Sequence, residues 1–147
     1  MNNYILRPMC ANDVTQIASI NSDIFLSLAW SRQMMLDELQ DDSKHYIVCT
    51  EGDRIIGYGG FSQILNEGHI MNIAVVNECR RLKIGSTILN MLLSKMRQLK
   101  IDSATLEVEE DNVNAIAMYK KAGFVEQGKR PNYYGKGRHC LILWVHI

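Results

Sequence analysis

Residues 72–94, NIAVVNECRRLKIGSTILNMLLS, decide the fold of this chain. They open with a short apolar run at Ile73–Val76, which is typical of the end of a buried strand. A polar and basic loop follows, and a helix is predicted to begin at Gly85. Ile88 and Leu92 lie four residues apart, so they share one core-facing stripe of that helix. The stretch therefore predicts a buried strand, a basic loop and an amphipathic helix.

The junction between the loop and the helix has the chemistry of an anion site. The N–H groups of a first helical turn have no partner within the helix, and the helix dipole is positive at this end. Arg80, Arg81 and Lys83 add positive charge beside it, so a phosphorylated ligand would fit there. Every strand-to-helix connection exposes such N–H groups, however, and basic loops are common on surfaces. This stretch alone therefore leaves a phosphate site and a plain surface loop equally open.

Length and composition are those of an ordinary globular protein. The chain has 147 residues, of which 47% are hydrophobic and 22% are charged, and we predict one domain spanning residues 1–147. The 16 Lys and Arg residues balance the 16 Asp and Glu residues, so no net field favours nucleic acid or a membrane as a partner. Residues 1–10 do not have the pattern of a secretion signal, and no apolar run is long enough to cross a bilayer.

The cysteines do not indicate a metal site. Cys10, Cys49, Cys79 and Cys140 are far apart and include no CxxC pair, so neither a zinc site nor a redox dithiol is predicted. Two disulfides are conceivable in a secreted protein, but the absence of a signal pattern favours reduced thiols. We therefore expect a cytoplasmic protein without a metal cofactor.

The rest of the chain predicts an α/β layer structure. Alternating or apolar runs bounded by turn residues predict strands near 4–7, 45–50, 54–64, 69–76, 104–108, 124–127 and 140–147. Besides the helix from Gly85, helical spacing and capping residues predict helices near 13–25, 31–39 and 113–122. Asn12 or Asp13, Ser31 and Asn112 are the candidate N-caps. Residues 128–138 are predicted to form a loop rich in Gly and Tyr.

That order of elements, with these sequences in place, resembles the GNAT family of acetyl-CoA-dependent N-acetyltransferases. The loop at 80–85 resembles the family's Gln/Arg-x-x-Gly-x-Gly pyrophosphate loop, and HIMNIAV at 69–75 resembles the strand before it. LEVEEDNVNAIAMYKKAGF at 106–124 resembles the next strand, loop and helix. RPNYY at 130–134 resembles the RimI-like branch, which acetylates the N-terminal α-amine of a small-subunit ribosomal protein. The resemblance covers about residues 4–145 and implies a mixed, mostly antiparallel sheet of about seven strands flanked by about four helices.

The resemblance also implies how acetyl-CoA would be held. The backbone of Ile73, Ala74 and Val75 would pair with the pantetheine arm, and the Val75 amide would polarise the thioester carbonyl. Asn112 would hydrogen-bond the pantetheine or cap the following helix, and these two roles are compatible. The pyrophosphate would be wrapped by Arg81, Leu82, Lys83, Ile84, Gly85 and Ser86. Lys83 stands where the family usually has its first glycine, so either the loop is slightly reshaped or lysine adds a phosphate contact.

Two further residues match the family's acid–base positions. Glu107 resembles the general base and Tyr119 the general acid of this branch. From the residues alone, Glu107 is equally an outward-facing solvated carboxylate between two apolar neighbours, and the Tyr119 ring is explained by core packing. His69 is a weaker candidate base, since strand histidines are usually structural. Tyr133 and Tyr134 are candidates either for clamping a peptide N-terminus or for simple loop packing.

The sequence therefore predicts an N-acetyltransferase acting on a protein N-terminus, with the N-terminal alanine of a small-subunit ribosomal protein as the expected acceptor. A GNAT protein that acetylates a small-molecule amine or a lysine side chain is the enzymatic alternative. The other alternative is a CoA-binding domain that has lost its chemistry. Acetyl-CoA and a protein or peptide N-terminus are the expected partners, and the sequence makes no prediction of oligomeric state.

Overall fold

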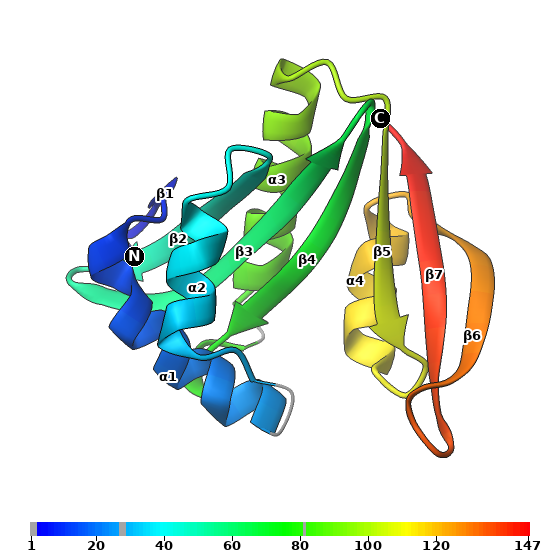
Figure 1. Cartoon of the computed structure of the whole chain (residues 1–147), viewed down its shortest axis with the longest axis horizontal. Helices are drawn as coiled ribbons and strands as arrows, with labels where there is room; N and C mark the ends of the chain where they lie inside the picture. Colours follow the sequence, from blue (N-terminus) through cyan, green and yellow to red (C-terminus); the bar gives the residue numbers. More distant parts are fainter. Residues whose placement is uncertain (1–2, 27–28, 81) are drawn as a thin grey trace. The chain divides into compact units, whose positions relative to one another are not determined.

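The computed structural model describes residues 3–26, 29–80 and 82–147. Its strands are β1 (Tyr4–Pro8), β2 (Lys44–Glu51), β3 (Arg54–Ile64), β4 (Glu67–Val75), β5 (Ser103–Glu109), β6 (Val125–Gly135) and β7 (Arg138–His146). Its helices are α1 (Val14–Phe25), α2 (Arg32–Leu39), α3 (Ile84–Gln98) and α4 (Val113–Lys121), with short 3-10 helices η1 (Ala11–Asp13) and η3 (Asn77–Cys79). Hydrogen bonds join the strands in the order β1-β2-β3-β4-β5-β7-β6 (Figure 1).

The sheet is mixed. Strands β4 and β5 run parallel, whereas β1–β2, β2–β3, β5–β7 and β6–β7 are antiparallel pairs. The predicted mixed, mostly antiparallel sheet of about seven strands with about four helices is confirmed. Within the part of the chain that the structure describes, no helix is both long and apolar enough to cross a membrane.

The chain divides into two compact units. Unit 1 comprises Met1–Ser62 and Met71–Leu92, and unit 2 comprises Gln63–Ile70 and Leu93–Ile147. Strands β3 and β4 and helix α3 therefore each contribute residues to both units. The expectation of a single domain over residues 1–147 stays a prediction.

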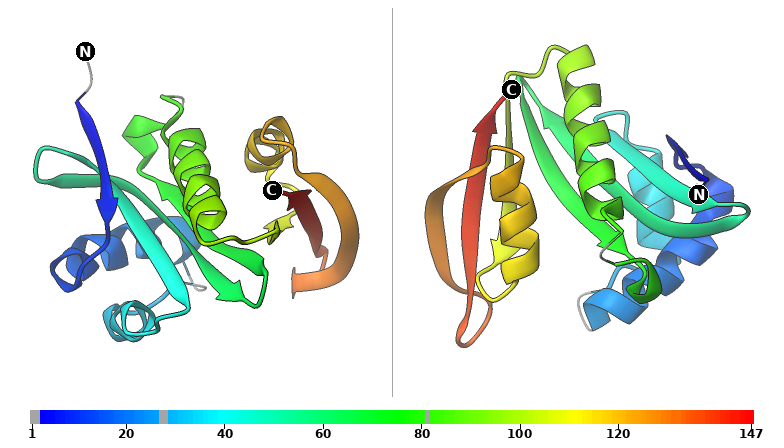
Figure 2. Two further views of the ribbon diagram at one scale, coloured as in Figure 1. Left: turned by 90° about the horizontal axis from the view of Figure 1, so that it is seen from above. Right: turned by 180° about the vertical axis from the view of Figure 1, so that it is seen from behind.

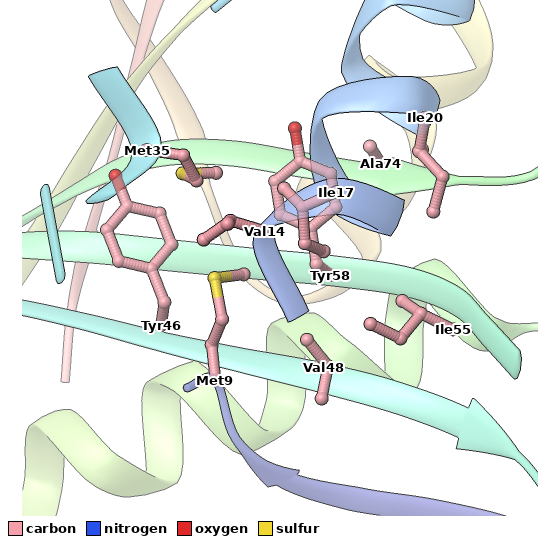
Figure 3. Packing of buried hydrophobic residues seen from close by; sticks show 10 residues of the cluster. All are labelled: Met9, Val14, Ile17, Ile20, Met35, Tyr46, Val48, Ile55, Tyr58 and Ala74. Atoms are coloured by element: carbon pink, nitrogen blue, oxygen red, sulfur yellow. The ribbon is translucent and has the colours of Figure 1, made fainter. Parts of the chain in front are cut away.

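The core of unit 1 lies between strands β2 and β3 and the two helices α1 and α2. Its buried members, shown in Figure 3, come from all four of these elements and from neighbouring segments: Met9, Val14, Ile17, Ile20, Met35, Tyr46, Val48, Ile55, Tyr58 and Ala74. One buried polar chain crosses this core. The Asn21 side-chain amide donates to the Tyr58 hydroxyl over 2.5 Å, and its oxygen accepts the Trp30 N–H over 2.6 Å. Because both groups are paired, the buried amide is satisfied.

Helix α3 covers the opposite face of the unit 1 strands, as the left view of Figure 2 shows. The predicted stripe is confirmed, because Ile88 and Leu92 are both buried. Glycines in β3 permit the close approach. A Cβ atom built on Gly59 would lie 2.6 Å from Cγ2 of Ile88, and one on Gly57 would lie 3.0 Å from its Cδ1. The absence of side chains at these two positions therefore lets the helix lie close to the strand backbone.

Unit 2 pairs the first residues of β4 with β5, and β5 with β7 and β6. The inward face of β5 is apolar, since Leu106 and Val108 are buried. Their partners in β7 face the same way, and a Cβ atom on Gly123, just after α4, would touch Val145 on that face. Figure 1 shows α4 running beside β5. Glu107, which lies between the two buried residues, therefore points to the sheet face away from α4.

Two local predictions were wrong. Neither Asn12 nor Asp13 caps α1 with its side chain, because the Asp13 carboxylate instead accepts two hydrogen bonds from Arg7, at 2.8 Å each, and one from the Cys10 N–H at 2.8 Å. Residues 128–138 are not a loop, because β6 continues to Gly135 and β7 begins at Arg138. The caps at Ser31 and Asn112 are confirmed.

Candidate functional site

The candidate anion-binding residues lie in unit 1, at the start of α3. Thr87 gives the first i to i−4 hydrogen bond of the helix, from its N–H to the Lys83 carbonyl over 3.0 Å, and its hydroxyl donates to the same oxygen over 2.9 Å. The preceding N–H groups, at Ile84, Gly85 and Ser86, therefore belong to the open first turn of the helix. Such a turn is suited to bind the oxygens of a phosphate group.

Lys83 itself adopts the backbone conformation that glycine would adopt. Its φ is 62°, in the left-handed region that costs an ordinary residue roughly 1–2 kcal/mol. The two alternatives for this position, a slightly reshaped loop and an added phosphate contact, stay predictions. The lysine side chain is exposed, as are those of Arg80 and Leu82, so its ammonium group is available to an anionic ligand. Arg81, also predicted to bind the pyrophosphate, lies outside the described residues.

The predicted pantetheine strand forms the end of β4, which leads into the loop. Ala74 is buried in the core of unit 1, whereas Ile73 and Val75 are half-buried. The Val75 carbonyl accepts a hydrogen bond from Nε of Arg80 over 3.3 Å, and the next residue, Val76, donates its N–H to the Ile56 carbonyl over 2.9 Å. These contacts hold the strand end and bring one guanidinium of the loop back to it.

The other predicted residues belong to unit 2. Asn112 precedes α4, and its side-chain oxygen accepts the Ala115 N–H over 3.3 Å, so the capping role is confirmed. Its predicted contact with pantetheine stays a prediction.

Glu107 lies half-buried at the centre of a polar cluster in unit 2, with its side chain 22% exposed. One of its carboxylate oxygens, Oε1, is 3.6 Å from Nε2 of His69 and 3.9 Å from Nη1 of Arg130. A hydrogen bond from the Tyr133 hydroxyl to the same carboxylate, together with its negative charge, raises the pKa of Tyr133. The alternative of a freely solvated carboxylate does not describe this environment.

Strand pairing explains how these residues meet. The ladder between β4 and β5 is parallel, with His69 opposite Thr105 and Ile70 opposite Leu106. His69 and Glu107 thus lie on the same face of neighbouring strands, two positions apart in register. Arg130 and Tyr133 come from β6, far along the chain. His69, the weaker candidate base from the sequence, thus lies beside Glu107. Its spacing in the sequence does not indicate this proximity, which depends on the parallel register of β4 and β5.

Tyr119 is the most buried of the predicted reactive groups. Its residue is 8% exposed, and its ring packs edge-on against Phe124 with the ring centres 5.8 Å apart. Burial raises the pKa of Tyr119 to about 12. Among the residues that the structure describes, no hydrogen-bond partner is seen for its hydroxyl. A buried phenol normally has such a partner, so this hydroxyl is free to donate to a ligand.

A cavity of about 260 Å³ lies elsewhere in unit 1, and none of the predicted site residues lines it. Its walls come from α1, the start of β3 and the segment after β4, and they include Ile20, Asp23, Arg54 and Glu78. An ion pair joins Arg54 to Glu78 at its edge. The charged residues that line it, Asp23, Arg54 and Glu78, are all exposed. Glu107 and Tyr119, which are more buried, are therefore the better candidates for catalysis.

The sequence matches a known family over most of its length. The profile of the Acetyltransferase (GNAT) family covers residues 14–124. The chain belongs to the GNAT family. Members of this family use acetyl-CoA, and the protein is an acetyl-CoA-dependent N-acetyltransferase.

Individual relatives agree with this assignment. A Bacillus subtilis (strain 168) protein, provisionally named a ribosomal protein bS18-alanine N-acetyltransferase, is 30% identical over 144 residues, which cover 97% of this chain and 95% of the relative. An N-alpha-acetyltransferase of Sulfurisphaera tokodaii is 28% identical over 153 residues, covering 95% and 91%. The crystal structure of Arabidopsis thaliana NAA60 in complex with acetyl-CoA superimposes with a TM-score of 0.90 at 15% identity, covering 99% of each chain, and so has the same fold.

The residues of this GNAT protein fit acetyl-CoA on structural grounds of their own. The left-handed Lys83 and the open first turn at Ile84, Gly85 and Ser86 form a backbone arrangement that a diphosphate can occupy. Within the described ranges, no group of three or more His, Cys, Asp or Glu side chains is placed to hold a metal ion.

Proposed function

We propose that this GNAT protein transfers the acetyl group of acetyl-CoA to the N-terminal α-amine of a protein, in particular the N-terminal alanine of a small-subunit ribosomal protein. The observation that carries the proposal is the half-buried carboxylate of Glu107 with His69, Arg130 and Tyr133 around it. The names of the Bacillus subtilis and Sulfurisphaera tokodaii relatives, which refer to alanine N-acetylation and N-alpha-acetylation, support the choice of acceptor.

The cofactor residues would act through backbone and charge. The last three residues of β4, Ile73, Ala74 and Val75, offer backbone N–H and C=O groups to the pantetheine arm. Asn112 offers its side-chain amide. The first turn of α3 and the exposed side chains of Arg80 and Lys83 provide N–H donors and positive charge for the pyrophosphate.

The transfer itself requires two proton movements. As the amine nitrogen forms its bond to the acetyl carbonyl carbon, the Glu107 carboxylate accepts the proton that the nitrogen loses, directly or through one water molecule. As the carbon–sulfur bond breaks, the Tyr119 hydroxyl donates a hydrogen bond to the sulfur, which carries the developing negative charge. The thiolate then leaves and takes its proton from solvent, and the products are the amide and CoA.

The ordinary pKa values of amines explain why an α-amine suits this site. An α-amine has a pKa near ~8 and a lysine side chain near ~10.4, so roughly 200 times more α-amine is already neutral at neutral pH. A single carboxylate base is therefore sufficient for an N-terminal acceptor, because a larger fraction of that amine is already deprotonated. We also propose that the protein acts in the cytoplasm, without a nucleic-acid or membrane partner, and its four free cysteines are in keeping with a reducing compartment.

The test is acetylation of two matched peptides followed by mass spectrometry. One peptide begins with a free alanine and contains no lysine, and the other has a blocked N-terminus and one lysine. We expect the first peptide to be acetylated and the second to react at least ~100-fold more slowly. Glu107→Gln should lower kcat by ~10²–10⁴-fold, whereas Glu126→Gln, a control at an exposed position of β6, should leave it unchanged.

Other outcomes would select the alternatives. Comparable rates on the two peptides would mean that the protein acetylates lysine side chains as well. Acetylation of a small-molecule amine with neither peptide modified would replace the proposed acceptor class. Binding of acetyl-CoA with no product on any amine would indicate a domain that has kept the cofactor and lost the reaction.

A further inference from the structure

The β6–β7 hairpin carries a large bulge beside Glu107. In the hairpin register Arg130 pairs with Cys140, but the next pair is Gly135 with Arg138. Four residues of β6, at 131–134, therefore stand opposite the single residue His139. A bulge of this size re-aims side chains away from the regular alternation of a strand. Tyr133 and Tyr134 are the side chains that it carries, with their rings packed edge to face at 5.0 Å.

Two hydrogen bonds fix the shape of this bulge. The Asn132 N–H donates to Nδ1 of His139 over 3.0 Å, across the hairpin. The Asn132 side-chain oxygen accepts the Gly137 N–H over 2.8 Å. Asn132 has a φ of 58°, a left-handed conformation that asparagine tolerates better than most residues. One asparagine thus binds the opposite strand through its backbone and the hairpin tip through its side chain.

An ion pair ties the same hairpin tip to β5. Arg138 donates from Nε and Nη2 to the two carboxylate oxygens of Glu109, each over 2.8 Å. This fork-to-fork geometry fixes direction as well as distance. Its other terminal nitrogen lies 3.5 Å from the Tyr134 carbonyl. Since Glu109 lies two residues after Glu107, on the same face of β5, the pair anchors the bulge next to the proposed base.

The bulge determines what surrounds Glu107. The Arg130 guanidinium, just before the bulge, lies 3.9 Å from the Glu107 carboxylate and over the Tyr133 ring at 5.6 Å from its centre, and Tyr133 feels the charge of the same carboxylate. If the bulge relaxed into a regular strand, the alternation of side chains would change which of these residues lie on the sheet face that carries Glu107. Simple hairpin stability would explain the ion pair, but it does not require a bond from Asn132 to one ring nitrogen of His139.

We propose that Asn132 and His139 are positioning residues: they hold the bulge so that Arg130 and Tyr133 stay beside Glu107 and the acceptor amine meets the base in one orientation. This inference rests on the proposed function, because it assigns the two residues to the acceptor side of that reaction. Neither residue contacts the reacting atoms.

The experiment compares variants that keep or remove the accepting atom. His139→Asn retains an acceptor close to the position of Nδ1, whereas His139→Phe keeps a ring without one. Asn132→Asp retains the side-chain oxygen, and Asn132→Gly keeps the left-handed backbone but loses it. We expect His139→Phe and Asn132→Gly to lower kcat/KM for the alanine peptide by about ten- to a hundredfold, because small misplacements near a reacting centre have effects of this order.

Comparing acetyl-CoA affinity with kcat/KM for the peptide distinguishes a positioning role from a general loss of fold. The acetyl-CoA affinity of all four variants should stay within about threefold of the wild type, and the two conservative variants should retain most of kcat/KM for the peptide. Equal loss in His139→Asn and His139→Phe, or equal weakening of acetyl-CoA binding, would overturn the proposal. If peptides react but His139→Phe matches the wild type, the positioning role fails while the proposed function stands.

An NMR titration, which needs no enzymatic turnover, tests the positioning role even if the wild type acetylates no peptide. Ring-labelled tyrosine NMR can follow the titration of Tyr133, whose pKa is raised chiefly by Glu107, with smaller effects of Arg130 and Cys140. Loss of the bulge should lower the Tyr133 pKa in His139→Phe, because the hydroxyl moves away from the negative charge of Glu107. An unchanged Tyr133 titration in His139→Phe would overturn the positioning role. Failure of the wild type to acetylate any peptide would separately refute the proposed function.

Discussion

Replacing Tyr119 with phenylalanine separates packing from catalysis, because the change removes only the hydroxyl. The ring is 8% exposed and packs against Phe124, so its apolar contacts survive the substitution. Burial raises the pKa of Tyr119 to about 12. At pH 8 only ~1 in 10⁴ of the phenol is therefore ionised, and the group is a hydrogen-bond donor throughout the working range.

The same pKa limits what the hydroxyl can do. A thiol has an ordinary pKa near ~8.5, so complete proton transfer from a phenol of pKa about 12 would be uphill by ~5 kcal/mol. Donation of a hydrogen bond to the developing thiolate carries no such penalty. A hydrogen bond to a charged group is worth ~1.5–3 kcal/mol, so Tyr119→Phe should lower kcat by ~10–150-fold. Because Tyr119 does not ionise below about pH 11, the reduction should be nearly constant with pH.

The assay measures CoA release under saturating acetyl-CoA, with acetyl-CoA affinity and thermal unfolding measured in parallel. Tyr58→Phe is the matched control, since burial also raises the pKa of Tyr58 to about 12 but its hydroxyl accepts a hydrogen bond from Asn21. The control should lose ~1 kcal/mol of stability and keep its kcat, whereas Tyr119→Phe should do the reverse. A kcat within twofold of the wild type in Tyr119→Phe would show that the residue only packs.

Three further substitutions test the fold and the loop. The Arg7 hydrogen bonds lower the pKa of Asp13 from 3.8 to about 2; the resulting stability is present above pH 3.8 and lost as pH falls through about 2. Allowing for the exposure of Arg7, Asp13→Asn should cost ~1–2 kcal/mol at pH 7 in urea unfolding and flatten that acid limb. Lys83→Gly should raise the free energy of unfolding by up to ~1 kcal/mol, and with it the melting temperature, because glycine adopts a φ of 62° without strain. Calorimetry on the same variant should show weaker acetyl-CoA binding that depends less on salt. Gly59→Ala should cost ~1–3 kcal/mol in urea unfolding, because its Cβ would lie 2.6 Å from Ile88; no loss would mean that helix and strand are not in close contact there.

Much of the fold was predictable because its signals are local. The apolar spacing of the helix after Gly85 needs only neighbouring residues to be recognised, and the structure buries that stripe as predicted. The caps at Ser31 and Asn112 follow from residue type and position, and both accept the expected backbone N–H. In each of these segments propensity, pattern and packing agree.

The failures occur where a contact distant in sequence decides the outcome. Residues 128–138 contain Gly, Pro and Tyr and have no alternation, yet pairing with β7 makes most of them a strand, and the missing alternation is the mark of the bulge. Asp13 has the residue type and position of a cap, but a bidentate contact with Arg7 competes with capping and wins. In both cases the local signal was genuine, and a partner elsewhere in the chain overrode it.

Glu107 shows how much of the site lay within reach of the sequence. A charged residue between Leu106 and Val108 must point away from the core that buries its neighbours, so its orientation followed from alternation alone. Its surroundings did not, because His69 reaches it through parallel register and Tyr133 through a four-residue bulge in β6. Since a slip of one residue in β5 would turn the carboxylate into the apolar face, the pairing that places these partners also keeps Glu107 on the reactive side. The register of the strands, which short motifs do not encode, therefore supplies the polar neighbours of a carboxylate that the motif already marks as a candidate base.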